Sequence, residues 1–134
     1  MRRTVWILVL LHVVGWNARS TFAQELPRIL VIATGGTIAG EQPEPGTLGG
    51  YDIKKTVGEV VALVPEANKY ALVETEQFLN IPSTNITPEN WLQLSKRITE
   101  VFRSRPEIAG VVVTHGTSRL EETAFFLRRC EKGR

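Results

Sequence analysis

Three short apolar runs mark the predicted strands of this sequence. Residues 28–33 and 111–114 are continuous and rich in β-branched side chains, a pattern typical of parallel strands that are buried on both faces. A third strand is predicted at 69–74. Glycine and proline dominate residues 40–50, so we expect a long loop there, without helix or strand. A long loop inside a compact domain is often functional.

Apolar positions three and four residues apart predict three helices. The first spans residues 57–64. The second begins after Thr87, a predicted N-cap, and ends at Pro106. Its apolar stripe consists of Trp91, Leu94, Ile98, Val101 and Phe102. The third helix begins at Ser118, where Glu121 completes the spacing of a capping box, and runs through Leu127.

Strands and helices alternate along the chain, and this order predicts the fold class. Alternation favours an α/β fold, in which a parallel sheet with right-handed crossovers is flanked by helices. The carboxyl ends of parallel strands meet at one edge of such a sheet, where ligands bind. At 134 residues, the chain forms one domain at most.

Composition narrows the function classes only slightly. Apolar residues make up 43% of the chain and charged residues 22%, values that are ordinary for a globular protein. The net charge is +2, so no nucleic-acid partner is expected. No group of residues has the spacing of metal ligands, and we therefore expect no metal site.

The N-terminus has the pattern of a signal peptide. Arg2 and Arg3 precede an apolar stretch, and small residues then stand at the positions that a signal peptidase recognises, with cleavage after Ala23. A membrane anchor is the alternative, but the stretch is shorter than a bilayer requires. We expect residues 1–23 to be removed and residues 24–134 to form a periplasmic or secreted domain that has no contact with the membrane.

Two threonines are the candidate reactive groups. Thr37 and Thr117 each follow a predicted strand and a glycine, so both hydroxyls are expected at the ligand-binding edge of the sheet. A threonine hydroxyl is a poor nucleophile unless a base, a relay or a cation activates it. Tyr51, beyond the glycine-rich loop, is a candidate to polarise Thr37. The glycines before Thr37 would allow a substrate to approach the backbone closely.

Other readings of these segments remain open. A strand followed by Gly-Gly-Thr is often only a tight turn with a capping threonine. A phosphate-binding loop is disfavoured, because no Lys-Ser or Lys-Thr pair follows the glycines. His115 is a possible base, although a histidine beside the end of a strand is more often structural.

Two separated motifs resemble the bacterial type II L-asparaginases. They are ATGGTIAG after the first strand and, farther along the chain, THGT followed by LEETAFFL. Intervening stretches are similar to the N-terminal domain of that family: GGYDIKKTVGEVV, ETEQFLNIPSTNIT and WLQLSKRI. The similarity extends from Leu26 to Leu127. It implies a flavodoxin-like parallel sheet.

The resemblance also implies a reaction and the residues that carry it out. Thr37 corresponds to the primary nucleophile, Tyr51 to its tyrosine partner on the lid, and Thr117 to the second catalytic threonine. Ser83 falls where the family binds the α-carboxylate of the substrate, and Thr84 lies beside it. The implied reaction is hydrolysis of L-asparagine to L-aspartate and ammonia through an acyl-enzyme, without a cofactor. Some family members also accept L-glutamine, and the family forms homotetramers.

The sequence departs from the family pattern in two respects. The family has an aspartate after the second threonine, where it holds the α-ammonium group of the substrate; here the residue is Ser118, which carries no charge. Family members are also more than twice as long, and the lysine that pairs with the second threonine lies beyond residue 134. The charged residues after Leu127 resemble a frameshift or truncation. We therefore expect a truncated domain with little or no turnover; the alternative is a non-catalytic remnant or interaction protein with the same fold.

Overall fold

The computed structural model describes residues 25–44, 46 and 50–131. The predicted signal peptide, residues 1–23, lies outside the described residues. In chain order the helices and strands are β1 (Arg28–Gly35), β2 (Gly40–Glu41), β3 (Asp52–Ile53), α2 (Val57–Ala62), β4 (Leu72–Ile81), α3 (Pro88–Ser104), β5 (Ile108–Thr114) and α4 (Leu120–Glu131). Short 3₁₀ turns lie between them at Thr37–Ala39, Pro65–Lys69, Ser83–Asn85 and Thr117–Arg119.

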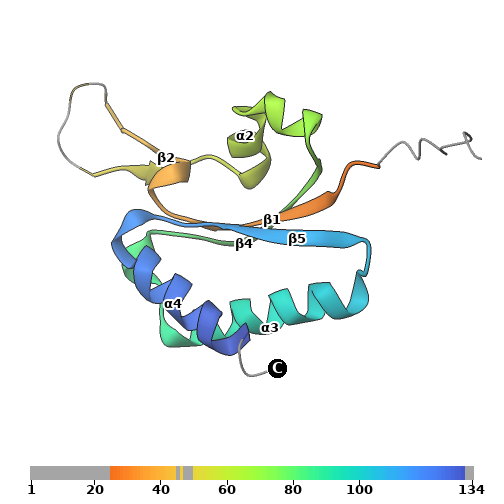
Figure 1. Ribbon diagram of the computed structural model, residues 1–134. Coiled ribbons are helices and arrows are strands. Elements are labelled where there is room, and N and C mark those ends of the chain that lie inside the picture. Colours follow the sequence, from red (N-terminus) through yellow and green to blue (C-terminus); the bar gives the residue numbers. More distant parts are fainter. Residues whose placement is uncertain (1–24, 45, 47–49, 132–134) are drawn as a thin grey trace, which may run out of the picture.

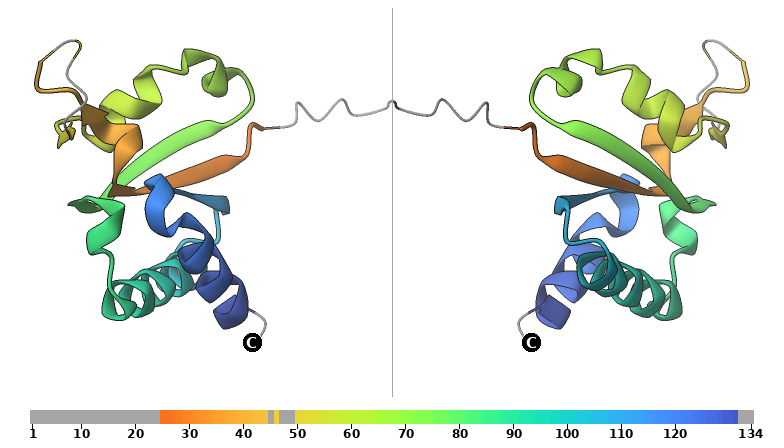
Figure 2. Two further views of the ribbon diagram at one scale, coloured as in Figure 1. Left: turned by 90° about the vertical axis from the view of Figure 1, so that its left-hand side faces the viewer. Right: turned by 90° about the vertical axis from the view of Figure 1, so that its right-hand side faces the viewer.

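The central sheet has the order β4-β1-β5, and both strand pairs are parallel. Leu30 of β1 stands opposite Glu74 on one side and Val111 on the other. Helix α2 covers one face of the sheet, and helices α3 and α4 cover the other (Figures 1 and 2). The predicted α/β architecture is confirmed.

Strand β1 is buried on both faces, as its continuous apolar run predicts. Leu30 and Ile32 pack toward α3 together with Leu94 and Val101. The alternate residues Val31 and Ala33 pack toward α2, against Val57 and Val61. Each fully buried aliphatic side chain stabilises the fold by about 1.5–3 kcal/mol. The two small cores therefore share β1, and this strand holds the layers together.

Helix α3 begins and ends where the sequence indicates. Thr87 is its N-cap and accepts a hydrogen bond from the Asn90 N–H at 3.3 Å, while the Asn90 side chain accepts one from the Thr87 N–H. Arg105 follows the last turn, directly before Pro106. Leu94 and Val101 of the predicted stripe are fully buried, whereas Phe102 is 45% exposed. The stripe is therefore confirmed at Leu94 and Val101, and Phe102 is the member that stays largely exposed.

Strand β4 was predicted too early in the chain. The sequence suggested residues 69–74, but the strand runs from Leu72 to Ile81, and Lys69 belongs to a 3₁₀ turn. Its polar residues explain the error. Glu76 accepts hydrogen bonds from Arg97 of α3 at 2.8 and 2.9 Å, so this strand meets the helix partly through charges rather than an apolar face.

The glycine-rich segment, residues 40–50, was expected to contain no strand, but its first two residues form one. Gly40 and Glu41 form β2, which pairs with Asp52 and Ile53 of β3 in antiparallel fashion. Lys55 donates a hydrogen bond to Glu41 at 2.6 Å, and its ammonium group holds the pKa of that carboxyl below its usual value. The backbone pairing and this ion pair hold the two ends of the loop together.

Two helix ends also differ from the prediction. Helix α2 ends at Ala62 rather than Val64, and α4 begins at Leu120 rather than Ser118. Gly116 is in an extended conformation, so the chain turns at residue 117 and Ser118 already lies inside the 3₁₀ turn. A side chain inside the turn is past the capping position. The predicted capping box at Ser118 is therefore wrong. At its other end α4 continues past Leu127 to Glu131.

Candidate active site

Three turns lie together at the carboxyl edge of the sheet. Because β1, β4 and β5 are parallel, the turn after each strand emerges at the same edge. We name these the Thr37 turn (Thr37–Ala39), the Ser83 turn (Ser83–Asn85) and the Thr117 turn (Thr117–Arg119). They lie at the left-hand end of the sheet in Figure 1, and the left panel of Figure 2 faces that end. The predicted site residues other than Tyr51 all belong to these turns.

The strand order places a topological switch point between β1 and β5. From β1 the chain passes to β4 on one side of it, and then crosses to β5 on the other side. Connections on either side of a switch point leave a crevice outside the carboxyl ends of the two strands, and ligands of open α/β sheets bind there. The Thr37 and Thr117 turns follow these two strands.

The Thr37 and Thr117 turns meet through glycine. A Cβ atom added at Gly36 would lie 2.5 Å from the Gly116 nitrogen, and one added at Gly116 would lie 2.6 Å from Ser83 Oγ. Gly36 also has a φ of +79°, which side chains of L-residues rarely adopt. Gly36 and Gly116 therefore let the three turns approach one another, and the access of a substrate to this backbone stays a prediction.

The structure brings Ser83 and Ser118 together, although they are far apart in the sequence. Ser83 is 2% exposed, and its Oγ accepts a hydrogen bond from the Ser118 N–H at 3.3 Å. Because this bond uses a lone pair of the hydroxyl, the Ser83 O–H remains able to donate to a ligand. Thr84 is exposed beside it, and its hydroxyl donates to Asn85 Oδ1 at 3.3 Å.

The ring of Tyr51 packs against Gly40, which directly follows the Thr37 turn. A Cβ atom at Gly40 would lie 3.0 Å from Tyr51 Cγ, so the absence of a side chain at Gly40 makes room for the half-buried tyrosine ring. The Lys54 and Lys55 N–H groups both donate to the Ala39 carbonyl at 3.1 Å, which ties the Thr37 turn to the segment after β3. Tyr51 is therefore held near the Thr37 turn from the far end of the loop.

The two threonine hydroxyls are accessible and have no partners among the described residues. Thr37 and Thr117 are both exposed. Within the described ranges, no side chain forms a hydrogen bond with either hydroxyl. The site as described thus offers two hydroxyls to solvent without a base in contact with them. A hydroxyl in this state is a weak nucleophile at neutral pH.

The sequence did not predict a series of side-chain hydrogen bonds that lies next to the Thr117 turn. His115 lies within hydrogen-bonding distance of Thr123 on α4, and Thr123 accepts a hydrogen bond from the indole N–H of Trp91 on α3. Trp91 was assigned only to an apolar stripe. A half-buried indole N–H requires an acceptor, and this requirement was the available signal that Trp91 has a polar partner.

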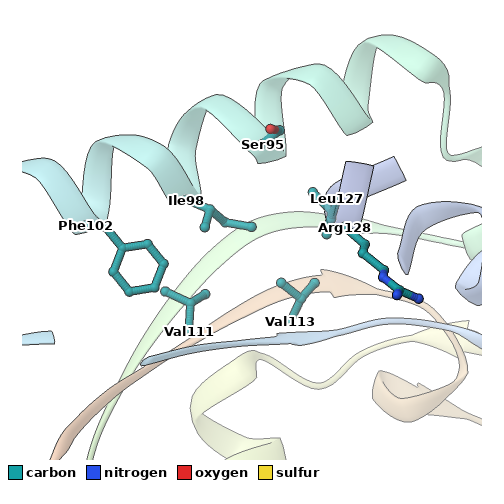
Figure 3. Close-up of a pocket in the computed structure, with 7 residues that line it drawn as sticks. All are labelled: Ser95, Ile98, Phe102, Val111, Val113, Leu127 and Arg128. Atoms are coloured by element: carbon teal, nitrogen blue, oxygen red, sulfur yellow. The ribbon is translucent and has the colours of Figure 1, made fainter. Parts of the chain in front are cut away.

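A separate apolar groove lies away from the three turns. It has a volume of about 590 Å³ and is lined from α3, β5 and α4 (Figure 3). Its lining residues are Ser95, Ile98, Phe102, Val111, Val113, Leu127 and Arg128. None of the candidate site residues lines it, so we do not assign the site to this groove.

Among residues 25–44, 46 and 50–131, no three His, Cys, Asp or Glu side chains are arranged to bind a metal ion. The same residues include no helix that is long and apolar enough to span a membrane.

Comparison with known proteins identifies the family whose pattern the chain follows. Residues 28–133 match the family model described as asparaginase, N-terminal. A glutaminase-asparaginase of Pseudomonas fluorescens biotype A is 39% identical over 127 residues, which are 93% of this chain and 35% of that protein. A probable periplasmic L-asparaginase of Haemophilus influenzae is 35% identical over 93% of this chain and 36% of its own length.

A solved structure shows the same relationship. The crystal structure of a probable cytoplasmic L-asparaginase from Campylobacter jejuni superposes with a TM-score of 0.69 at 40% sequence identity. The match covers 75% of this chain and 31% of the other. The chain spans about a third of the length of the relatives it matches.

Proposed function

The chain belongs to the asparaginase family, within its N-terminal domain, and on this premise we propose that the three turns form the substrate site of an amidohydrolase. The proposed substrate is L-asparagine, with L-glutamine as a second substrate, and the products are the free acid and ammonia. The convergence of the Thr37, Ser83 and Thr117 turns at the switch point carries this proposal.

Thr37 is the proposed nucleophile. Its Oγ attacks the side-chain amide carbon of L-asparagine, the C–N bond breaks, and the hydroxyl proton leaves with the ammonia. Water then attacks the resulting ester, the ester C–O bond breaks, L-aspartate is released, and a proton from that water restores the Thr37 hydroxyl. In this proposal Tyr51 polarises the Thr37 hydroxyl and Thr117 activates the water; the packing of the Tyr51 ring against Gly40, next to the Thr37 turn, supports the role of Tyr51. These steps use no cofactor.

The remaining candidate residues bind the amino-acid end of the substrate. Ser83 donates its hydroxyl to the α-carboxylate, and the exposed Thr84 and Ser118 line the same side of the crevice. Since Ser118 is neutral, the α-ammonium group gains no charge-assisted hydrogen bond from this position. Within the described part of the chain no base contacts either threonine, and together with the neutral Ser118 this supports weak binding and slow turnover by the 134 residues.

We expect Thr37→Ala to reduce ammonia release from L-asparagine to the buffer background. The substitution removes the attacking oxygen, and because Thr37 is exposed, the loss of its side chain removes no buried packing contact. The measurement is the initial rate of ammonia release by the 134-residue chain, followed with a coupled assay at high protein concentration. Thr75→Ala is the matched control, because Thr75 is also exposed but lies within β4, away from the turns.

Other outcomes of this experiment have distinct meanings. If Thr37→Ala kept the rate of the unmodified chain, Thr37 would not be the nucleophile. If the unmodified chain bound L-aspartate but released no ammonia, the chain would be a non-catalytic member of the family. Assembly into a homotetramer, as the family resemblance implies, is measured on the same sample by light scattering.

We also propose that the protein is exported. The order of two arginines, an apolar stretch and small residues before Gln24 supports this proposal. The relatives differ in location, because one is named periplasmic and another cytoplasmic. Expression in a bacterial host should give a periplasmic product whose mass corresponds to a start at Gln24. A product that retained Met1 would contradict export by cleavage.

A further inference from the structure

A chain of hydrogen bonds connects α3, α4 and the end of β5. The indole Nε1–H of Trp91 donates to Thr123 Oγ1 at 2.7 Å. Thr123 Oγ1 lies 3.0 Å from His115 Nε2. On the other side of the ring, His115 Nδ1 lies 2.7 Å from the carbonyl oxygen of Gly116. The imidazole therefore bridges a buried hydroxyl and the peptide that begins the Thr117 turn.

The chemistry of the partners determines the direction of each bond. A carbonyl oxygen only accepts, so His115 Nδ1 must carry the hydrogen that it shares with Gly116. In the neutral ring the other nitrogen is then an acceptor, and the Thr123 hydroxyl donates to Nε2. The indole N–H of Trp91 only donates, so it supplies the hydrogen that Thr123 Oγ1 accepts. In this arrangement each of the three contacts has one donor and one acceptor, and both ring nitrogens are used.

Both ends of the hydrogen-bond chain are fixed by packing. Thr123 is 3% exposed, and the Trp91 ring stacks on Phe126 with the ring centroids 5.7 Å apart. At the other end Gly116 is buried between Gly36 and the Ser83 hydroxyl. A rotation of the Gly116 peptide would break its bond to His115, and it would also shift the start of the Thr117 turn.

We propose that His115 is a positioning residue, locked in its Nδ1–H tautomer by Thr123 and Trp91, which holds the Gly116 peptide and thereby orients Thr117. The ring is not the base of the reaction, since both of its nitrogens are already engaged. The role of Thr117 in turnover rests on the proposed function; the tautomer and its effect on the Thr117 turn do not.

The tautomer is measured by long-range proton–nitrogen NMR of the ¹⁵N-labelled 134-residue chain. The ring signals of His115 are assigned by their loss in His115→Gln, which leaves His12 as the other histidine of the sequence. We expect a single Nδ1–H pattern for His115. An Nε2–H pattern, or signals averaged between the two tautomers, would overturn the proposal. His115→Gln is the only variant that must fold for this measurement.

A pair of substitutions at Thr123 tests whether the hydroxyl sets the tautomer. Thr123→Val removes the donor at nearly constant shape, whereas Thr123→Ser keeps it. In Thr123→Val we expect averaged His115 ring signals and shifted backbone amide signals from Gly116 to Ser118; Thr123→Ser should retain the native signals. If Thr123→Val left the ring and these amides unchanged, His115 would not be held through Thr123.

Addition of L-aspartate to the same samples separates this inference from the proposed function. If L-aspartate shifted none of the amide signals of the three turns, the proposed substrate site would fail. The positioning role of His115 would still be tested independently, by its tautomer and by the amide shifts of the Thr117 turn in Thr123→Val.

Discussion

At the scale of single residues, Ser118 is the position where the proposed site lacks a charge for the ammonium group of its proposed ligand. An α-amino acid presents a carboxylate and an ammonium group close together. Ser83 can donate to the carboxylate, and Ser118 lies beside it, since its N–H donates to Ser83 Oγ. An exposed serine at this position offers the ammonium group only a neutral hydroxyl. A carboxylate here would complete the recognition of both groups.

We therefore expect Ser118→Asp to strengthen the binding of L-aspartate. A hydrogen bond to a charged group contributes about 1.5–3 kcal/mol, which corresponds to about tenfold tighter binding or more. Isothermal titration with L-aspartate measures the change. Ser118→Asn is the control, because it adds similar volume without charge. Equal affinities of the Asp and Asn variants would show that charge at this position is not what limits binding.

At the scale of elements, the turns depend on glycine where backbones meet. Gly36 combines a positive φ with contact to Gly116, whereas a Cβ atom added at Gly46, which has a φ of +86°, would have no described atom within 4 Å. Alanine at Gly46 would add backbone strain alone, whereas alanine at Gly36 would add strain and steric overlap with Gly116. The packing of the Thr37 turn against the Thr117 turn is therefore testable with alanine alone.

We expect Gly36→Ala to lower the free energy of unfolding more than Gly46→Ala. Strain at a positive φ costs about 1–2 kcal/mol at either position. At Gly36 the added methyl group also overlaps the Gly116 backbone, and overpacking of this kind costs about 1–3 kcal/mol more. Urea unfolding of both variants gives the difference. Equal losses would mean that the Thr37 and Thr117 turns are not in contact in solution.

At the scale of the whole molecule, arginine–glutamate pairs join the layers along β4. Glu74 accepts a hydrogen bond from Arg105 at 2.8 Å and one from Arg28 at 3.2 Å, and Arg97 binds Glu76 with two hydrogen bonds. The Arg105 guanidinium, and after it the Arg28 guanidinium, holds the pKa of Glu74 below its ordinary value of 4.5. Burial opposes this effect without reversing it. The carboxylate of Glu74 therefore links the stability of the fold to pH.

We expect the protein to lose stability in acid. The folded-state pKa of Glu74 lies below the unfolded value, so the unfolded chain binds more protons as the pH falls. The contribution is complete above the unfolded pKa of 4.5 and is lost as the pH falls through the lower folded value. Urea midpoints measured from neutral to acidic pH test this dependence.

The control for the acid effect is Glu74→Gln, which removes this titration and should flatten part of the curve. Added salt should flatten it as well, because the pairs are partly exposed and therefore screened. A midpoint that did not change between neutral pH and pH below 4.5 would contradict the link.

The local sequence was sufficient to predict β1 and the N-terminus of α3. The continuous apolar run of β1 needs burial on both faces whatever surrounds it, and Thr87 can satisfy the free N–H groups of α3 without help from other elements. The local apolar runs also predicted that Thr37 and Thr117 each follow a strand, and both lie in turns after the parallel strands β1 and β5. The motifs that flank them also indicated the family.

Only the tertiary structure decided three features: the position of β4, the contacts between the turns, and the chain of hydrogen bonds at His115. The charged residues Glu76 and Glu74 of β4 pair with Arg97 of α3 and with Arg105, which follows that helix. The hydrogen bonds between Trp91, Thr123 and His115 likewise join separate elements. A hydrogen bond or steric contact between distant residues depends on where folding places both partners. The sequence could name the hydroxyls and glycines of the site, but their mutual positions follow from the order of strands and the packing of helices.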